Sequence, residues 1–171
     1  GNSSQRFNER VLDALQASCI AITDPDHNTV LLVGADLIQV EPFLVEPVKE
    51  MVEARFGIPK ANVLVNVSHS HSAPDLRNQK EPSICRYLEE LPGRIVESIE
   101  KALEDRKEIT GVYAGSVEAE GLNFVRHYVL ENGTYAGDNF GDFKASPIAG
   151  HATEADPTMH LVKLTRNGGK D

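Results

Sequence analysis

Several signatures of common protein classes are missing from this 171-residue sequence, and each absence removes a class of function. It has no uninterrupted apolar run of about 18 residues, so no membrane span is expected. Its two cysteines, Cys19 and Cys85, form no CxxC pair, which excludes a disulfide framework and a zinc knuckle. A single bond between these two thiols stays open. There is no GxSxG elbow, P-loop, GxGxxG fingerprint or HExxH helix, so phosphate cradles and serine-hydrolase triads are not supported.

A basic stripe is also missing. The net charge is −9, and the densest basic cluster, Arg106 and Lys107, stands among acidic residues. A chain that binds nucleic acid needs clustered positive charge to displace the counterions of the phosphate backbone. Nucleic acid is therefore not an expected partner. The content of 40% hydrophobic and 25% charged residues is ordinary for a soluble globular protein.

The pattern of apolar residues in the first two thirds predicts an α/β fold. Two apolar runs joined by the turn formers of "DPDHN" indicate a β-hairpin. A helix, a short β-branched strand and a second helix follow, so the sheet should be mixed, with a βαβ core flanked by two main helices. Pro47 should delay the first helix to about Glu46, and Pro92-Gly93 should kink or split the second. The expected elements are strands 17–23, 30–38 and 62–68 and helices 46–56 and 82–104.

The last third predicts strands and one long loop. Residues 109–119 are strand-like, and the Asn-Gly turn in "YVLENGTYA" indicates a second hairpin. Residues 137–158 show no period and many turn formers, which predicts a long irregular loop that binds a ligand or partner. We expect one domain over 1–171, with residues 1–10 a residual tag or a disordered N-terminus. The ending "RNGGKD" is a hairpin turn without a returning strand, which favours a fragment of a larger protein.

The most informative motif is "SHSHSAP", which follows the strand of residues 62–68 directly. Ligands of α/β proteins gather at the carboxyl ends of strands, and this is where His69 and His71 stand. In an extended segment, residues two apart point the same way, so both imidazoles can face one pocket. Neutral imidazole is a good zinc ligand, and a catalytic zinc needs three protein ligands and an open position. The alternative is a polar loop that happens to contain histidine.

Other candidates for this site are spread along the chain. Asp36 interrupts an apolar strand and needs a partner, either a site imidazole, which we favour, or a structural group. Arg126 should find an anion, which is either a structural carboxylate or a substrate oxygen. His127 and His151 are weaker candidates for further ligands.

Together these segments resemble a known family. The stretches that carry the resemblance are "GADLIQV", "VEPVKEMVEARFGIPKANVLVNVSHSHSAPD", "GLNFVRHY" and "EADPTMHLVKLTRNGGK". They resemble the N-terminal part of neutral/alkaline non-lysosomal ceramidases, and most closely their bacterial relatives. The family motif is closer to "THTHSGP", so serines replace threonines here and Ala73 replaces glycine, which alters the backbone freedom of the loop.

The resemblance implies a zinc-dependent amidohydrolase that cleaves an N-acyl amide bond. It implies zinc as the cofactor, His69 as a zinc ligand, His71 as an active-site neighbour and Arg126, by a looser match, as a substrate or oxyanion contact. The family's remaining zinc ligands and its serine nucleophile are not found here, so this chain alone is expected to be incomplete for catalysis.

The expected partners are a small-molecule amide or lipid substrate, and either the missing C-terminal part of the parent chain or a second copy. The expected location is secreted or periplasmic. Two other functions stay open: a non-catalytic binding module that retains the fold, and a small self-contained metal-binding protein in which His127, His151 or a dimer completes the coordination.

Overall fold

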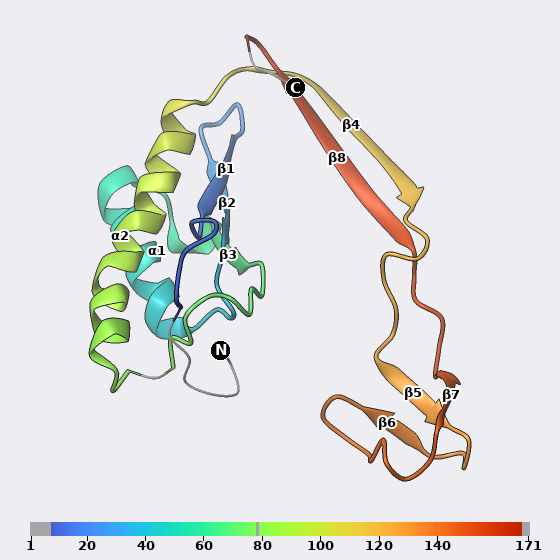
Figure 1. Cartoon of the computed structure of the whole chain (residues 1–171). Coiled ribbons are helices and arrows are strands. Elements are labelled where there is room, and N and C mark those ends of the chain that lie inside the picture. The colour runs from blue at the N-terminus through green and yellow to red at the C-terminus, as the bar shows by residue number, and fades with distance from the viewer. Residues whose placement is uncertain (1–7, 78, 169–171) are drawn as a thin grey trace. The chain divides into compact units, whose positions relative to one another are not determined.

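A computed structural model of the chain describes residues 8–77 and 79–168 (Figure 1). The chain divides into two compact units, residues 1–106 and 107–171, and each is described by itself. The described residues form two α-helices and three small sheets, which confirms the predicted mixed α/β class. We expected a tag or disorder at residues 1–10, and most of these residues lie outside the described ones. Part of the turn in the final "RNGGKD" also lies outside them.

The sheet of the first unit has three strands in the order β1-β2-β3. Strands β1 (Ala17–Thr23) and β2 (Thr29–Ala35) are antiparallel, while β3 (Val63–Val67) pairs with β2 in parallel. The predicted hairpin and the predicted βαβ unit are both confirmed. Because β2 and β3 run the same way, the segments that follow them leave the sheet at one edge.

Helix α1 connects β2 to β3 and spans Pro42–Phe56, so the predicted start near Glu46 is wrong. Pro42 occupies the first turn, where its missing N–H would have no helical partner. Pro47 lies one turn further and removes only one backbone hydrogen bond. The buried Leu44 and Val48 flank it, and their packing holds the helix across this position. A 3₁₀ turn, η1 (Lys60–Asn62), leads into β3.

Helix α2 spans Pro82–Glu104 without interruption, so of the kink or split that we expected at Pro92, the split does not occur. Pro92 is buried with Leu91 on the apolar face of the helix. A proline inside a helix costs one hydrogen bond and a steric contact, and here the packing of a strongly amphipathic 23-residue helix outweighs that cost.

Both helices cover the same face of the sheet. The core of the first unit lies between the helices and this face (Figure 1). Inward residues of β2 alternate with exposed ones, as expected for a strand with one buried face. The buried core residues are Leu31, Val33, Ala35, Leu37, Leu44, Val48, Val52, Ile58, Val63, Leu76, Leu91, Ile95, Val96 and Ile99.

The opposite face of the sheet carries an apolar row. Ile20 pairs with Leu32, and Leu32 pairs with Leu64, so the three side chains stand side by side across the strands. They are 57%, 40% and 53% exposed. No layer covers this face among the described residues of the first unit.

The second unit contains a ribbon and a small sheet. Strands β4 (Ile109–Glu118) and β8 (Thr158–Arg166) form the antiparallel ribbon. Strands β5 (His127–Leu130), β6 (Tyr135–Gly137) and β7 (Ile148–His151) form the sheet, in the order β6-β5-β7. The predicted hairpin at Asn132-Gly133 is confirmed, since β5 and β6 flank this turn.

The prediction that residues 137–158 are entirely irregular is wrong, because β7 pairs with β5 inside that stretch. The four-residue strand follows Pro147 and its pairing contains a register shift, so it has too few residues to show an alternating pattern.

Candidate active site: the loop after β3

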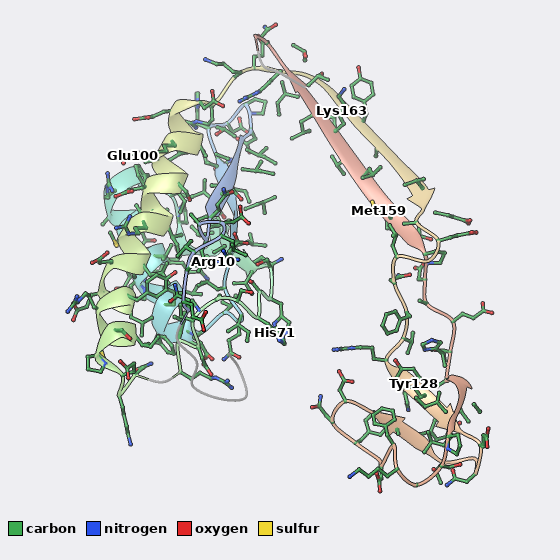
Figure 2. All side chains as sticks on the ribbon, in the orientation of Figure 1. Arg10, His71, Glu100, Tyr128, Met159 and Lys163 are labelled. Atoms are coloured by element: carbon green, nitrogen blue, oxygen red, sulfur yellow. The ribbon has the colours of Figure 1, made fainter. Side chains whose placement is uncertain are left out.

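The "SHSHSAP" motif forms a loop that continues the pairing of β3 with β2 beyond the ends of both strands. The Ser68 N–H donates to the Ala35 carbonyl at 3.1 Å, and the Ser70 N–H donates to the Leu37 carbonyl at 3.1 Å. The segment after β2 therefore serves as a backbone template for the histidine loop. Figure 2 shows His71 on this loop, at the end of β3.

His69 lies at the centre of the loop in an unusual backbone conformation. Its φ is 57°, in the left-handed region that non-glycine residues rarely occupy. Its Nδ1 lies 2.5 Å from the Ile38 carbonyl oxygen. Because a carbonyl can only accept, Nδ1 carries the proton, and the Nε2 of a neutral ring keeps its lone pair. This is the usual way in which a protein orients a metal-binding imidazole.

The ring of His71 meets the ring of His69. The two Nε2 atoms are 3.3 Å apart, and the ring centroids are 5.0 Å apart with the planes at 74°. The expectation that the two imidazoles come together is thus correct, although the extended conformation behind it is wrong, because the left-handed step at His69 turns the chain. Without a metal, the His71 Nε2–H donates to the His69 Nε2.

The spacing of these two nitrogen atoms suits zinc. Two nitrogens bound to one tetrahedral zinc ion at about 2.0–2.1 Å lie about 3.3–3.4 Å from each other. The observed Nε2–Nε2 separation is 3.3 Å. The pair therefore matches one edge of a zinc coordination tetrahedron and offers two donors of the right chemistry.

The part of the chain that the structure describes does not gather a complete set of protein ligands around this pair. Over residues 8–77 and 79–168, no group of three or more His, Cys, Asp or Glu side chains has the arrangement to hold a metal ion. The described part of the chain thus fits half of a zinc site.

Asp36 does not bind an imidazole, so the role that we favoured for it from sequence is wrong. Its Oδ1 accepts from the Ser68 hydroxyl at 3.0 Å, and its Oδ2 accepts from the Gln16 N–H at 3.0 Å. The Asp36 N–H donates in turn to the Gln16 carbonyl at 2.8 Å. Asp36 therefore ties the histidine loop to the segment before β1. The Ser68 hydroxyl thus reaches a carboxylate that follows the neighbouring strand.

The far end of the loop is held by two buried side chains, Ala73 and Leu76. Ala73 does not have a positive φ, so an alanine at this position causes no backbone strain. Beside it, the Arg77 guanidinium donates to the Asp75 carboxylate with an ion-pair distance of 2.7 Å, which lowers the pKa of Asp75 below its ordinary value. This carboxylate is thus engaged by arginine.

Arg126, the third predicted site residue, belongs to the second unit. Its Nη1 lies 2.7 Å from Asp138 Oδ2, and both side chains are largely exposed. The arginine has the anionic partner that we expected, in the form of a carboxylate of its own unit. An exposed pair of this kind contributes little to stability.

The two weaker candidates also lie in the second unit. His127 packs against the rings of Tyr135 and Phe140. The His151 Nδ1–H donates to the Val125 carbonyl at 2.6 Å, and its ring contacts Tyr128. Each imidazole is thus part of an aromatic contact within the small sheet.

The carbonyl of Ile38 is the functional group that sequence reasoning missed. A backbone acceptor has no residue-type signal, although the position of Ile38, just beyond a strand that neighbours the motif strand, indicates it once the pairing is known.

The chain matches no protein-family model and no curated protein. In the described residues, no helix has both the length and the apolar character that a membrane-crossing segment requires.

Proposed function

We propose that this chain supplies the His69–His71 part of the zinc centre of an amide hydrolase that resembles the neutral ceramidases. The observation that carries the proposal is the 3.3 Å separation of the two Nε2 atoms, together with the fixed tautomer of His69. The motif "SHSHSAP" and its place after a parallel strand support it, because this is where α/β proteins bind ligands.

Zinc, when bound, would polarise the amide carbonyl or lower the pKa of a water molecule. His69 holds the metal through the lone pair of Nε2, since its Nδ1 proton is committed to Ile38. We assign His71 the place of the active-site neighbour that the family resemblance implies, with its Nε2 beside that of His69. The same nitrogen, deprotonated, also has the spacing of a second zinc ligand.

Arg126 keeps the role of a substrate or oxyanion contact in this proposal. Asp138 engages one terminal nitrogen of the guanidinium, and the remaining N–H groups can donate to a substrate oxygen. The proposed substrate is an N-acyl amide, either lipid-like or small, and the proposed location is secreted or periplasmic.

The test is zinc binding, measured by competition with a chromophoric chelator. We expect His69→Ala and His71→Ala each to weaken zinc binding by about tenfold or more, because each removes one of the two paired imidazole nitrogens. His27→Ala is the matched control, since His27 also has a left-handed φ, of 65°, but lies in the β1–β2 turn. Equal affinity of the His69→Ala variant and the wild type would refute the proposal.

A second function is favoured by one observation, the lack of a three-donor group in the described residues. A non-catalytic module would bind zinc or another ligand through the histidine pair without hydrolysing an amide. Hydrolysis of a fluorescent N-acylsphingosine by the longest natural chain that contains this sequence decides between the two. Zinc-dependent turnover that is lost in His69→Ala supports the hydrolase, and zinc binding without turnover supports the module.

A further inference from the structure

The histidine pair depends on a backbone conformation that the chain does not adopt by preference. His69 has a φ of 57°, and left-handed non-glycine residues persist only where their surroundings hold them. Four hydrogen bonds hold this one. They are Ser68 N–H to Ala35, Ser70 N–H to Leu37, His69 Nδ1–H to Ile38, and Ser68 Oγ–H to Asp36.

Three of these bonds end on backbone carbonyls, which any sequence provides. The fourth is different, because it needs a hydroxyl at position 68 and a carboxylate at position 36. The other oxygen of the same carboxylate accepts from the Gln16 N–H, so Asp36 connects the residue before His69 to the segment that enters β1. Without the Ser68 contact, two backbone bonds and the bond from the His69 ring to Ile38 would define the turn at His69.

We propose that Asp36 is a positioning residue for the metal-binding pair and that it acts through the hydroxyl of Ser68. This inference rests on the proposed function, since it assigns Asp36 and Ser68 to the support of the same zinc ligand. Asp36 touches neither imidazole. It fixes the backbone from which His69 directs its Nε2 toward that of His71. Groups that hydrogen-bond a metal ligand directly change metal affinity by about 10- to 100-fold when they are removed, so for Asp36, one bond further away, we expect the lower end of this range.

The chain offers matched variants for the test. Ser68→Ala removes the hydroxyl, whereas Ser68→Thr keeps it. Asp36→Ala removes both acceptor oxygens. Gln16→Ala is a control, because Gln16 contributes only its backbone N–H and carbonyl to these contacts. Far-UV circular dichroism, which reports α1 and α2, verifies that each variant is folded.

Two measurements are made on the full chain, zinc affinity by chelator competition and the ¹⁵N NMR signals of the His69 ring without metal. We expect Ser68→Ala and Asp36→Ala to bind zinc about tenfold more weakly or worse, and Ser68→Thr and Gln16→Ala to stay within about threefold of wild type. In the NMR spectrum, the weakened variants should lose the signature of a ring protonated only at Nδ1, because a released loop samples both tautomers.

Each outcome separates this inference from the proposed function. Wild-type affinity in Ser68→Ala and Asp36→Ala, with loss in His69→Ala, overturns the role of Asp36 and leaves the zinc proposal standing. A Ser68→Thr variant as weak as Ser68→Ala also overturns it, because the hydroxyl would then not be the active group. An unchanged affinity of His69→Ala overturns both.

Discussion

The contrast between the two faces of the β1-β2-β3 sheet leads to a quantitative prediction. Ile99 of α2 is 0% exposed beneath the covered face, while Ile20 of β1 is 57% exposed on the other. Truncating isoleucine to alanine removes three carbons, worth about 2.4 kcal/mol when fully buried, and the cavity raises the cost for Ile99→Ala to about 3–4 kcal/mol. Ile20→Ala should cost about 1 kcal/mol, because less than half of that side chain is buried.

Urea unfolding followed by far-UV circular dichroism measures both values. The α-helices of the described residues both lie in the first unit, so the helical signal reports that unit. With a urea dependence of about 1.3 kcal/mol per molar for a unit of this size, Ile99→Ala should lower the midpoint by about 2–3 M and Ile20→Ala by less than about 1 M. Ile20→Thr, which keeps the β-branch, should cost no more than the alanine variant. Equal losses at positions 20 and 99 would show that the outer face is covered in solution, and would refute the reasoning.

Three further predictions concern single groups. Burial raises the pKa of the Cys19 thiol to about 11. In a Cys85→Ser variant, alkylation of Cys19 at pH 8 should therefore be slow in the folded chain and fast in urea. The stabilisation from this protonated thiol is present below its ordinary pKa and is lost as pH rises toward about 11. In Arg77→Gln, the pKa of Asp75 measured by NMR should rise toward its ordinary value. In the wild type, the small stabilisation from the Arg77–Asp75 pair is present above the ordinary pKa of Asp75, and it is lost as pH falls through the lowered pKa. Gly141→Ala should lower the stability of the second unit by roughly 1–3 kcal/mol, because φ is 70° and the new methyl would lie 2.3 Å from a carbonyl oxygen. The control, Gly150→Ala, should be neutral, because its new methyl would meet nothing within 4 Å. Unfolding of both variants is followed by near-UV circular dichroism of the tyrosines.

Much of the fold was predictable because its signals are local. The hairpin before Thr29 and the turn at Asn132-Gly133 follow from residues that favour turns, and the strands beside them follow from short apolar runs. The βαβ unit follows from the order of those elements. That order alone predicts that the motif histidines lie where a parallel strand ends.

The failures arise where distant packing overrides a local rule. Pro47 and Pro92 both lie inside helices, because buried neighbours stabilise the helices more than one missing hydrogen bond destabilises them. The four residues of β7 become a strand only because β5 offers an edge, which no local pattern reveals.

The candidate site was predictable in its residues and not in its geometry. The spacing of His69 and His71 predicted that their rings face one pocket, and in the structure the two rings are in contact. The left-handed step at His69 and the Ile38 acceptor depend on the neighbouring strand, so they required the structure. The partner of Asp36 was missed for the same reason, because the Ser68 hydroxyl follows the neighbouring strand β3, 32 residues further along the chain.

The left-handed step at His69 has a consequence for protein design. Transplanting the letters HxH onto the end of another parallel strand would not reproduce the converging rings, because an extended backbone would place both side chains on one face without turning one ring onto the other. A graft would also have to carry the carbonyl three residues beyond the end of β2 and a carboxylate–hydroxyl contact beside the first histidine. The smallest transferable unit is therefore two adjacent strand ends, with their sequences taken together.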